Sequence, residues 1–259
     1  MHYISEKWRD ILVFNQLDTH EKIWELEAEW FEEPNHRRGG WSGVSRIELN
    51  LPQGGKIGVF LKRQENHVSK SWRHPVRGFS TFVREYEHIK AFQENSIPSL
   101  DLVFFEEWKD DGDLRAIIMT EELADYIPLS SDEYQPGGIF VSTKTQRVNF
   151  FKRLASLMQV MHDNGYQHNC FYLKHVFARP LQDGDVELRV IDLEKVKKPL
   201  VKRRATFRDL YTLSRHSDRW GIKDKIRFYR QYHEEEKLSK KSKKLWFEIA
   251  DKIARKSKI

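Results

Sequence analysis

Residues 168–194 read HNCFYLKHVFARPLQDGDVELRVIDLE, and this segment is the most informative one about the fold. Two short apolar runs, Val176-Phe177-Ala178 and Leu188-Arg189-Val190-Ile191, flank a polar segment and predict two strands joined by a turn. A loop with Gly165 and His168 precedes them, and Asp192 follows the second run directly. A carboxylate just after an apolar strand is well placed to hold Mg²⁺ on phosphate groups, and a turn or cap residue is the alternative.

The hydrophobic pattern outside this segment differs between the two halves of the chain. The second half is mainly helical by pattern, and its strongest helix is predicted from about 144 to 163. The first half predicts two β-hairpins, over 44–62 and around an acidic turn at 109–113, and a helix over 80–94. Residues 1–35 form a mixed lead-in. We therefore predict an α+β fold in which a β-rich half precedes a helical half.

Composition places the chain among globular proteins. It has 259 residues and a net charge of +6, and its 13% of aromatic residues argues against global disorder. The single cysteine, Cys170, excludes an internal disulfide and a zinc site built from several cysteines. The N-terminus lacks an apolar run after a basic start, and no segment approaches the roughly 20 apolar residues of a membrane span. We therefore expect a cytoplasmic protein.

Positive charge is concentrated near the C-terminus. Residues 237–259 contain nine Lys and Arg against two acids, and a second basic run covers 195–204. Such runs attract the phosphates of nucleic acid, of anionic lipid or of a phosphorylated substrate. The apolar residues of the tail follow helical spacing: Trp246, Ile249, Ala250 and Ile253. Two interpretations stay open, a helix docked on the body by this stripe and a basic amphipathic helix on an anionic membrane.

Two features of the first half suggest phosphate chemistry. A glycine-rich turn at 37–43 includes Gly40 and Gly43, and it is either a phosphate-binding loop or a plain hairpin turn. Lys62 ends a predicted strand, and Glu85 follows 23 residues later on the next predicted helix. A Lys held by a helical Glu can grip nucleotide phosphates, and a pair of ordinary surface charges is the alternative.

The order of all these features is more informative than any one of them. It runs from the glycine-rich segment, the strand Lys and the helix Glu through a hinge and a long helix to the His168 loop and Asp192. This is the order of the protein-kinase signature set. We therefore predict a bilobal protein-kinase-like fold, with a β-rich N-lobe and hinge over 1–125 and a mainly helical C-lobe over 126–259.

Longer segments around these features carry a resemblance to one family. They are Gly39-Gly40-Trp41-Ser42-Gly43-Val44-Ser45-Arg46, Phe60-Leu61-Lys62-Arg63-Gln64-Glu65-Asn66-His67, His74-Pro75-Val76-Arg77-Gly78, Thr81-Phe82-Val83-Arg84-Glu85-Tyr86, Thr120-Glu121-Glu122-Leu123, His168-Asn169-Cys170-Phe171-Tyr172-Leu173-Lys174-His175, Val190-Ile191-Asp192-Leu193-Glu194 and Arg208-Asp209-Leu210. Together they resemble the lipopolysaccharide kinase (Kdo/WaaP) family, most closely its InaA-like branch, from about residue 36 to 232.

The resemblance implies ATP-dependent phosphorylation of a sugar in the lipopolysaccharide core, on the cytoplasmic face of the inner membrane. It implies ATP and Mg²⁺ as cofactors and the core or a related glycolipid as partner, with no nucleic acid. The implied nucleotide-binding residues are Gly40, Gly43, Lys62, Glu85, Glu121 and Leu123. Among them Lys62 would contact the α/β-phosphates, and residues 121–123 would be the hinge that offers backbone groups to adenine. Asp192 would bind Mg²⁺, and Asp209 resembles the acid that braces the catalytic loop.

The chain departs from the family pattern at its chemical centre. Cys170 stands in the slot of the catalytic Asp, and His175 stands in the slot of a metal-binding Asn. Mg²⁺ prefers oxygen ligands, so His175 is an unusual candidate for the metal site. Cys170 acts as a base only if its pKa is suitably tuned, and a small packing residue is the alternative. Glu194, where Gly is expected, is a candidate second acid or metal ligand, and His168 is expected to pack beneath the loop. The catalytic candidates are Lys62, Cys170 and Asp192.

Two functions lead. The first is an active ATP-dependent kinase of the lipopolysaccharide core, whose basic segments would face anionic lipid or phosphorylated glycolipid. The second is a pseudokinase that binds nucleotide or acts as a scaffold without phosphotransfer, because Cys170 replaces the catalytic Asp. A nucleic-acid-binding protein is disfavoured because the sequence has no aromatic and glycine-rich RNA-binding motif. A protein Ser/Thr kinase is disfavoured because no Ala-Pro-Glu motif follows Asp192.

Overall fold

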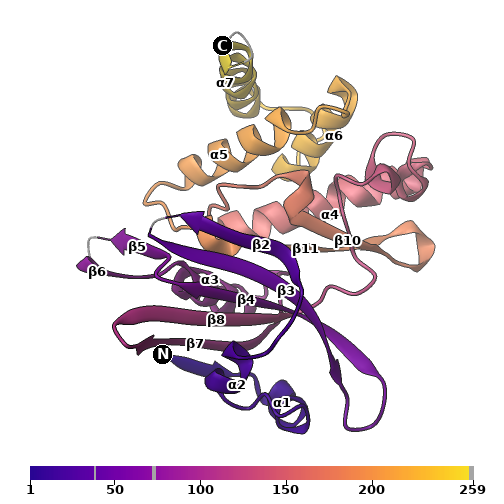
Figure 1. Ribbon diagram of the computed structural model, residues 1–259. Coiled ribbons are helices and arrows are strands. Elements are labelled where there is room, and N and C mark those ends of the chain that lie inside the picture. The colour runs from indigo at the N-terminus through magenta and orange to yellow at the C-terminus, as the bar shows by residue number, and fades with distance from the viewer. Residues whose placement is uncertain (38, 72–73, 257–259) are drawn as a thin grey trace. The chain divides into compact units, whose positions relative to one another are not determined.

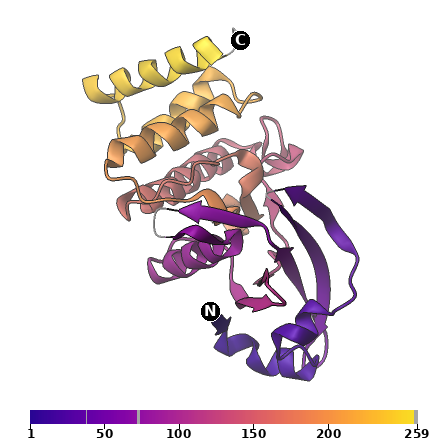
Figure 2. The same ribbon diagram turned by 60° about the vertical axis from the view of Figure 1, so that its left-hand side comes forward.

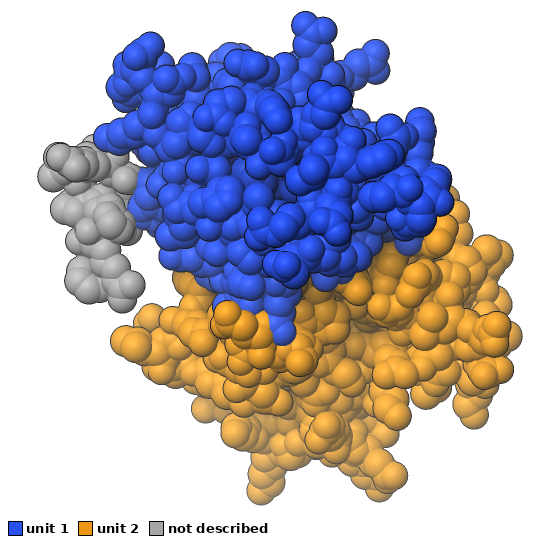
Figure 3. All heavy atoms as spheres, turned by 90° about the horizontal axis from the view of Figure 1, so that it is seen from below, with its two compact units in different colours: residues 1–93, 100–124 blue, residues 94–99, 125–259 orange. Residues whose placement is uncertain are grey.

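The computed structural model describes residues 1–37, 39–71 and 74–256. Arg38 in the glycine-rich segment and Lys258 in the basic tail lie outside the described residues. The chain forms two compact units, which Figure 3 colours separately: unit 1 comprises residues 1–93 and 100–124, and unit 2 comprises residues 94–99 and 125–259. None of the described helices is long and apolar enough to cross a membrane.

Unit 1 is built around a six-stranded antiparallel sheet (Figure 1). In chain order its strands are β1 (His2–Ile4), β2 (Trp30–Arg37), β3 (Gly40–Asn50), β4 (Lys56–Glu65), β7 (Leu102–Asp110) and β8 (Asp113–Glu121). Their order in the sheet is β1-β7-β8-β4-β3-β2. The unit also contains the short helices α1 (Arg9–Phe14) and α2 (His20–Trp24), the hairpin of β5 (Val68–Ser71) and β6 (His74–Ser80), and helix α3 (Thr81–Glu94).

Both hairpins predicted for the first half are confirmed. The hairpin predicted over 44–62 is the β3–β4 pair, and residues 51–55 connect its strands, with φ angles of 93° at Gly54 and 88° at Gly55. The second hairpin is β7–β8, and it turns at Asp111 and Gly112, with φ angles of 48° and 95°. In this two-residue turn of β7–β8 both central φ angles are positive, which matches the twist of paired strands, and Gly, Asn and Asp adopt such angles most readily.

The N-terminal part differs from its prediction in detail. The glycine-rich turn predicted at 37–43 is shorter than expected, because Gly39 is a turn residue with a φ of 83° and β3 already begins at Gly40. Residues 1–35, interpreted as a mixed lead-in, contain β1, α1, α2 and the start of β2. Strand β2 shifts register against β3 twice between Trp30 and Asn35. These irregularities interrupt the apolar alternation by which a strand is recognised in sequence.

The lead-in residues and α3 cover opposite faces of the sheet. Trp8 and Ile23 from the lead-in pack in a buried cluster with Phe104 of β7. Tyr86 of α3 stacks on Phe105 of the same strand, with 4.3 Å between the ring centroids. Successive side chains of a strand point to opposite faces, so these two contacts lie on different sides. The lead-in is therefore part of the core of unit 1.

Unit 2 combines a small sheet with four helices that lie beside one another (Figure 2). The sheet has three strands in the order β11-β10-β9, namely β9 (Ile127–Pro128), β10 (Val176–Pro180) and β11 (Val186–Val190). The four helices among the described residues are α4 (Lys144–Asp163), α5 (Lys202–Arg215), α6 (Ile222–His233) and α7 (Lys240–Lys256). Short 3-10 helices include Leu173–His175, before β10, and Leu193–Lys195, after β11.

The elements predicted around residues 168–194 are confirmed. The helix predicted over 144–163 is α4, and the two apolar runs form the antiparallel pair β10–β11. Helix α4 begins with a capping box: Thr143 accepts a hydrogen bond from the N–H of Gln146, and the Gln146 side chain accepts one from the N–H of Thr143. These bonds satisfy donors that a helix start otherwise leaves open.

The C-terminal helix α7 is docked on unit 2, which confirms one of the two interpretations of its stripe. Ile249 is 2% exposed. Trp246 packs edge-on against Tyr229 of α6, with 5.1 Å between the ring centroids. Oε2 of Glu248 forms an ion pair with a guanidinium nitrogen of Arg203 on α5, at a distance of 2.5 Å. Trp246 and Ile249 of the apolar stripe are therefore packed within unit 2.

Candidate active site

Lys62 and Glu85 form an ion pair inside unit 1. Lys62 lies on β4 and Glu85 on α3, and Nζ of Lys62 donates to Oε1 of Glu85 over 2.7 Å. The Glu85 side chain is only 4% exposed, so the interpretation as a pair of ordinary surface charges is wrong. A buried carboxylate needs a cation, and the pair therefore fixes the Lys62 ammonium in one place. A Lys held in this way is available for phosphate oxygens.

Gly40 and Gly43 lie on β3, and each has a packing reason to be glycine. A Cβ on Gly40 would lie 2.0 Å from the carbonyl oxygen of Glu65, and a Cβ on Gly43 would lie 2.6 Å from the Trp30 ring. Any larger residue would push the neighbouring strand or the indole away. The packing of the sheet thus explains both glycines, and their role in phosphate binding stays a prediction.

The predicted hinge begins at Glu121, the last residue of β8. The Glu121 carboxylate binds Nζ of Lys7 at 2.7 Å. The Glu122 carboxylate accepts two hydrogen bonds of 2.8 Å from the Arg46 guanidinium. The N–H groups of both glutamates donate to carbonyl groups within unit 1. These groups are therefore already used, and adenine binding by the remaining backbone up to Leu123 stays a prediction.

Asp209 of α5 braces the loop at 168–170, as the family resemblance implied. Its fully buried carboxylate accepts hydrogen bonds from the N–H groups of His168 at 2.7 Å and Asn169 at 2.9 Å. It also lies 3.1 Å from Nε2 of His162 on α4. Asn169 has a φ of 68°, in the left-handed region where Asn is found more often than most residues. The loop conformation is therefore fixed by a buried anion.

His168 packs beneath the loop, as expected. Its Nε2 donates to the carbonyl oxygen of Ile191 at 2.9 Å, and its Nδ1 accepts from the N–H of Cys170 at 3.3 Å. One donor and one acceptor nitrogen define a neutral imidazole with its proton on Nε2. Complete burial lowers the pKa of His168, in agreement with that neutral form. His168 thus ties the loop to the backbone just before Asp192.

Cys170, His175 and Asp192 are brought together in unit 2. Nδ1 of His175 donates to the carbonyl oxygen of Cys170 at 2.9 Å and lies 3.4 Å from Oδ2 of Asp192. Burial lowers the pKa of His175, so its imidazole is neutral at pH 7 and its lone pair is on Nε2. Burial raises the pKa of the Cys170 thiol, which is therefore protonated at neutral pH. This state favours a packing role for Cys170 over a role as base.

Asp192 offers a partly exposed carboxylate for a metal ion. Its side chain is 29% exposed, and its φ of 62° is left-handed. Within residues 1–37, 39–71 and 74–256, no three or more His, Cys, Asp or Glu gather in a metal-binding group. Mg²⁺ commonly takes one or two carboxylates together with substrate phosphates and water, so Asp192 fits such an ion. Glu194 lies in the 3-10 helix after Asp192 without a positive φ, so the missing Gly causes no backbone strain there.

A polar chain behind Asp209 was not predicted from the sequence. Nδ1 of His162 contacts the hydroxyl of Tyr232 on α6 at 2.7 Å, and this hydroxyl lies 3.2 Å from Oγ1 of Thr206. Burial raises the pKa of Tyr232 to about 12, so the hydroxyl stays neutral. His162 was visible as a polar member of the buried stripe of α4. Tyr232 lies 70 residues further along the chain, and no motif marks it.

A kinase-like fold is defined by three features of the chain: the Lys62–Glu85 pair, the loop at 168–170 that Asp209 braces, and Asp192 after β11. The family model of the Lipopolysaccharide kinase (Kdo/WaaP) family matches residues 21–232, and the chain belongs to this family. It is 33% identical to Protein InaA of Escherichia coli (strain K12) over 193 residues, which cover 74% of this chain and 85% of InaA. These findings confirm the resemblance seen in the sequence and support a phosphotransferase.

A solved structure described as WaaP in complex with acyl carrier protein has the same fold. Its TM-score to this chain is 0.71 at 19% sequence identity, and the match covers 100% of this chain and 98% of that chain. The predicted protein-kinase-like fold is therefore confirmed.

Proposed function

We propose that this protein is an ATP-dependent kinase that phosphorylates a sugar of the lipopolysaccharide core. The observation that carries the proposal is the Lys62–Glu85 ion pair, because a buried Glu that holds a strand Lys positions an ammonium for nucleotide phosphates. Membership of the lipopolysaccharide kinase family supports the choice of acceptor. The proposed location is the cytoplasm, with peripheral contact at the inner membrane that holds the lipid-linked acceptor.

In this proposal unit 1 binds the nucleotide. Lys62 contacts the α/β-phosphates, and Gly40 and Gly43 allow the backbone of β3 to approach them. The backbone of Glu121 and Leu123 faces the adenine. The nucleotide affinity then depends on the Lys62 ammonium, which Glu85 keeps in place.

Unit 2 supplies the metal ligand and the loop for the acceptor. Asp192 is the proposed Mg²⁺ ligand, and the ion when bound neutralises charge on the transferred phosphoryl group. His175 is the weaker metal candidate, because Mg²⁺ prefers oxygen ligands to a ring nitrogen. In addition, Nδ1 of His175 donates a hydrogen bond to the carbonyl oxygen of Cys170. Asp209 keeps the loop backbone in one conformation, so the loop can orient the acceptor hydroxyl.

Phosphoryl transfer depends mainly on positioning and charge neutralisation, so a chain without a catalytic Asp can still transfer phosphate. A general base accelerates a reaction by roughly 10²–10⁴-fold. The neutral Cys170 thiol does not act as a base, so the protein lacks this acceleration. The same observation favours one alternative, a pseudokinase that binds nucleotide and transfers nothing. The two candidates share the fold and differ only in turnover.

The test is phosphate transfer from ATP to purified lipopolysaccharide core with Mg²⁺. Wild type is compared with Lys62→Met, with Asp192→Asn and with the control Lys56→Met. Lys56 lies on the same strand as Lys62, but it is exposed and pairs with Glu48 at the surface. We expect the first two variants to lose about 10²-fold or more in rate, as when one charge-stabilising donor is removed from an active site. The control should stay within about twofold of wild type.

Calorimetric titration of ATP separates the alternatives. Transfer by wild type that is lost in Asp192→Asn supports the kinase. ATP binding without any phosphate on the acceptor supports the pseudokinase. Undiminished transfer by Lys62→Met contradicts the role given to the ion pair.

A further inference from the structure

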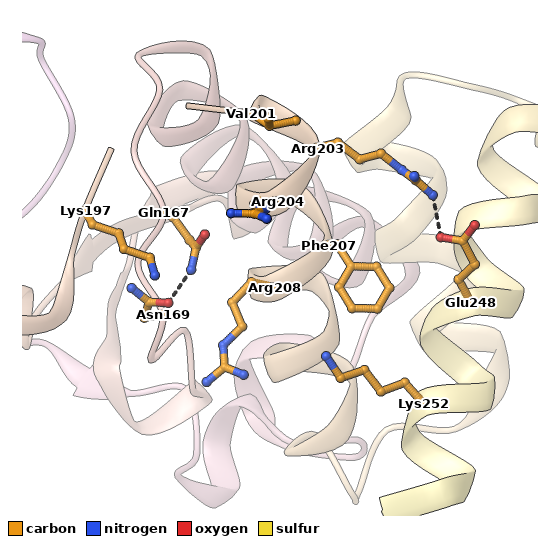
Figure 4. Close-up of a pocket in the computed structure, with 10 residues that line it drawn as sticks. All are labelled: Gln167, Asn169, Lys197, Val201, Arg203, Arg204, Phe207, Arg208, Glu248 and Lys252. Carbon is orange, nitrogen blue, oxygen red and sulfur yellow. Dashed lines mark hydrogen bonds and ion pairs between the residues drawn. The ribbon is translucent and has the colours of Figure 1, made fainter. Parts of the chain in front are cut away.

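A basic pocket lies on unit 2 beside the loop that precedes Cys170. Its volume is about 750 Å³, and Figure 4 shows side chains of the loop, of α5 and of α7 around it. The residues that carry the argument are Asn169, Lys197, Arg204, Phe207, Arg208 and Lys252. The pocket was visible in sequence only as part of the basic run 195–204, because α7 and the loop contribute from distant positions.

The charges in the pocket are mostly unbalanced. Its lining has five Lys and Arg side chains and one carboxylate, Glu248, which is bound by Arg203. Lys197, Arg204 and Arg208 are exposed, and none of them forms an ion pair with a carboxylate among the described residues. Cations gathered without counter-charges raise the local potential and attract an anion. The pocket therefore has the chemistry of an anion site.

One wall of the pocket belongs to the braced loop. Gln167 donates to the side-chain oxygen of Asn169, and Nδ2 of Asn169 donates to the carbonyl oxygen of Lys195 at 2.7 Å, so the wall is held in place (Figure 4). Asn169 directly precedes Cys170. Burial raises the pKa of Cys170, and the positive charge of Arg208 opposes this rise. Arg208 is thus within electrostatic reach of the residue in the catalytic slot.

The aromatic ring in the pocket is already covered. Nζ of Lys252 lies 4.8 Å from the centroid of the Phe207 ring, and Tyr211 lies parallel to that ring at 6.3 Å. Proteins that bind single-stranded nucleic acid use aromatic faces on which bases can stack. The covered ring disfavours a nucleobase and leaves charged groups as the main source of recognition.

The rim of the pocket has an exposed apolar pair. Leu200 is completely exposed, and Val201, which lines the pocket, is 55% exposed. Lys197, Lys198 and Lys202 surround this pair in the sequence. Exposed apolar side chains among cations are suited to contact with an anionic lipid surface. The pocket and its rim together match a ligand with an anionic head and a lipid part.

We infer that this pocket binds the phosphate or carboxylate groups of the lipid-linked saccharide acceptor, with Arg204 and Arg208 as principal contacts and Leu200 at the lipid. The identity of the ligand rests on the proposed function, and the anion site itself rests on the pocket. Arginine is suited to the task because its planar fork binds phosphate and carboxylate with two parallel hydrogen bonds. Binding beside Asn169 would bring the acceptor next to the residue in the catalytic slot.

The experiment measures binding of phosphate-bearing core oligosaccharide, freed of lipid, to the full chain by calorimetry at one fixed salt concentration. The pocket variant is Arg204→Gln/Arg208→Gln. The matched control is Lys240→Gln/Lys243→Gln, which removes the same charge from exposed positions of α7 outside the pocket. We expect Kd to rise about tenfold or more in the pocket variant, since a charge-assisted contact contributes about that factor. The control should stay within about twofold.

Two further measurements distinguish the sources of the anion. One uses chemically dephosphorylated oligosaccharide as the ligand, and the other uses inorganic phosphate as a competitor. Weaker binding of the dephosphorylated oligosaccharide, with weak competition by inorganic phosphate, supports recognition of a saccharide-borne anion. Equal Kd values for wild type and the pocket variant overturn the inference. So does pocket-dependent binding to vesicles of phosphatidylcholine and phosphatidylglycerol without any binding of the oligosaccharide, because the site would then serve a general lipid surface.

The lipid part of the inference is tested with Leu200→Asp. We expect this variant to weaken binding of intact lipopolysaccharide in phosphatidylcholine vesicles and to leave binding of the lipid-free oligosaccharide unchanged. Equal binding of the intact lipopolysaccharide by wild type and variant overturns the role of Leu200.

Transfer assays keep this inference separate from the proposed function. If wild type transfers phosphate and the pocket variant has an unchanged KM for the core, the inference fails and the kinase stands. If the pocket binds the oligosaccharide and no transfer occurs, the kinase fails and the anion site stands.

Discussion

At the scale of single residues, Asp209 is the anchor of the loop that carries Cys170. It is fully buried, and its charge is compensated by two backbone N–H groups and by His162. A buried anion with such partners holds a backbone in place, because removing it leaves donors unsatisfied. The loop therefore depends on one carboxylate from a helix distant in sequence.

Asp209→Asn should lower the free energy of unfolding by about 2–4 kcal/mol, because its amide group would oppose donors that need an acceptor. The measurement is denaturant unfolding. The control is Asp132→Asn, at a carboxylate that is 87% exposed and pairs with Arg219 at the surface. That change should stay within about 0.5 kcal/mol. A loss in the control as large as in Asp209→Asn would contradict the anchoring role.

Substitutions of Cys170 test whether the proposed kinase works without a base. Because burial keeps the thiol protonated, we expect Cys170→Ala to leave the transfer rate within about threefold of wild type. Cys170→Asp should raise the rate by about 10²-fold, in the range that a general base contributes. The measurement is phosphate transfer at saturating ATP. If Cys170→Ala loses as much rate as Asp192→Asn, the thiol takes part in catalysis.

Part of the candidate site could be predicted from the sequence and part could not. Lys62, Glu85 and Asp192 were found because strand and helix patterns place them at recognisable positions of a known motif order. The contact of His162 with Tyr232 joins residues 70 positions apart, and no local pattern encodes it. The basic pocket was missed for the same reason.

At the scale of elements, regular periodicity decided what could be predicted. Helix α4 and the β3–β4 hairpin were predicted because their apolar residues repeat regularly over many positions. Helices α1 and α2 have six and five residues, too few for a helical period to be read. The register shifts in β2 hid that strand. Short or irregular elements are stabilised by packing in the folded unit rather than by local pattern.

Helix α7 should contribute to stability through its buried side. Ile249 is 2% exposed, whereas Phe247 on the same helix is 68% exposed. We expect Ile249→Ala to lower the free energy of unfolding by about 2–4 kcal/mol, because it leaves a cavity against the helices below. Phe247→Ala is the matched control and should change it by less than about 0.5 kcal/mol. Denaturant unfolding checks both values, and equal losses would contradict the docked helix.

At the scale of the whole molecule, buried histidines link stability to pH. Among the described residues, burial lowers the pKa of His168, His175 and His233. In the unfolded chain a histidine takes up a proton near pH 6.5, and in the folded chain these histidines take it up only at lower pH. The unfolded state therefore binds more protons around and below pH 6.5, so stability is full about one pH unit above 6.5 and falls as the pH drops.

We expect the free energy of unfolding to fall between about pH 7.5 and pH 5.5, by at most about 1.4 kcal/mol per pH unit for each histidine. Denaturant unfolding at several pH values measures the slope. His233→Gln should make the slope shallower, because it removes one of these histidines, whose Nε2 is buried without a hydrogen-bond partner among the described residues. A free energy of unfolding that does not change over this range would contradict the prediction.

The central claim is that a chain of this family with Cys170 in the catalytic slot still transfers phosphate to the lipopolysaccharide core. The most direct measurement is mass spectrometry of the core oligosaccharide after incubation with ATP that carries ¹⁸O in its γ-phosphate. The account predicts a labelled phosphoryl group on the oligosaccharide with wild type and none with Asp192→Asn. An unmodified oligosaccharide in the presence of folded wild-type protein with bound ATP would contradict the claim.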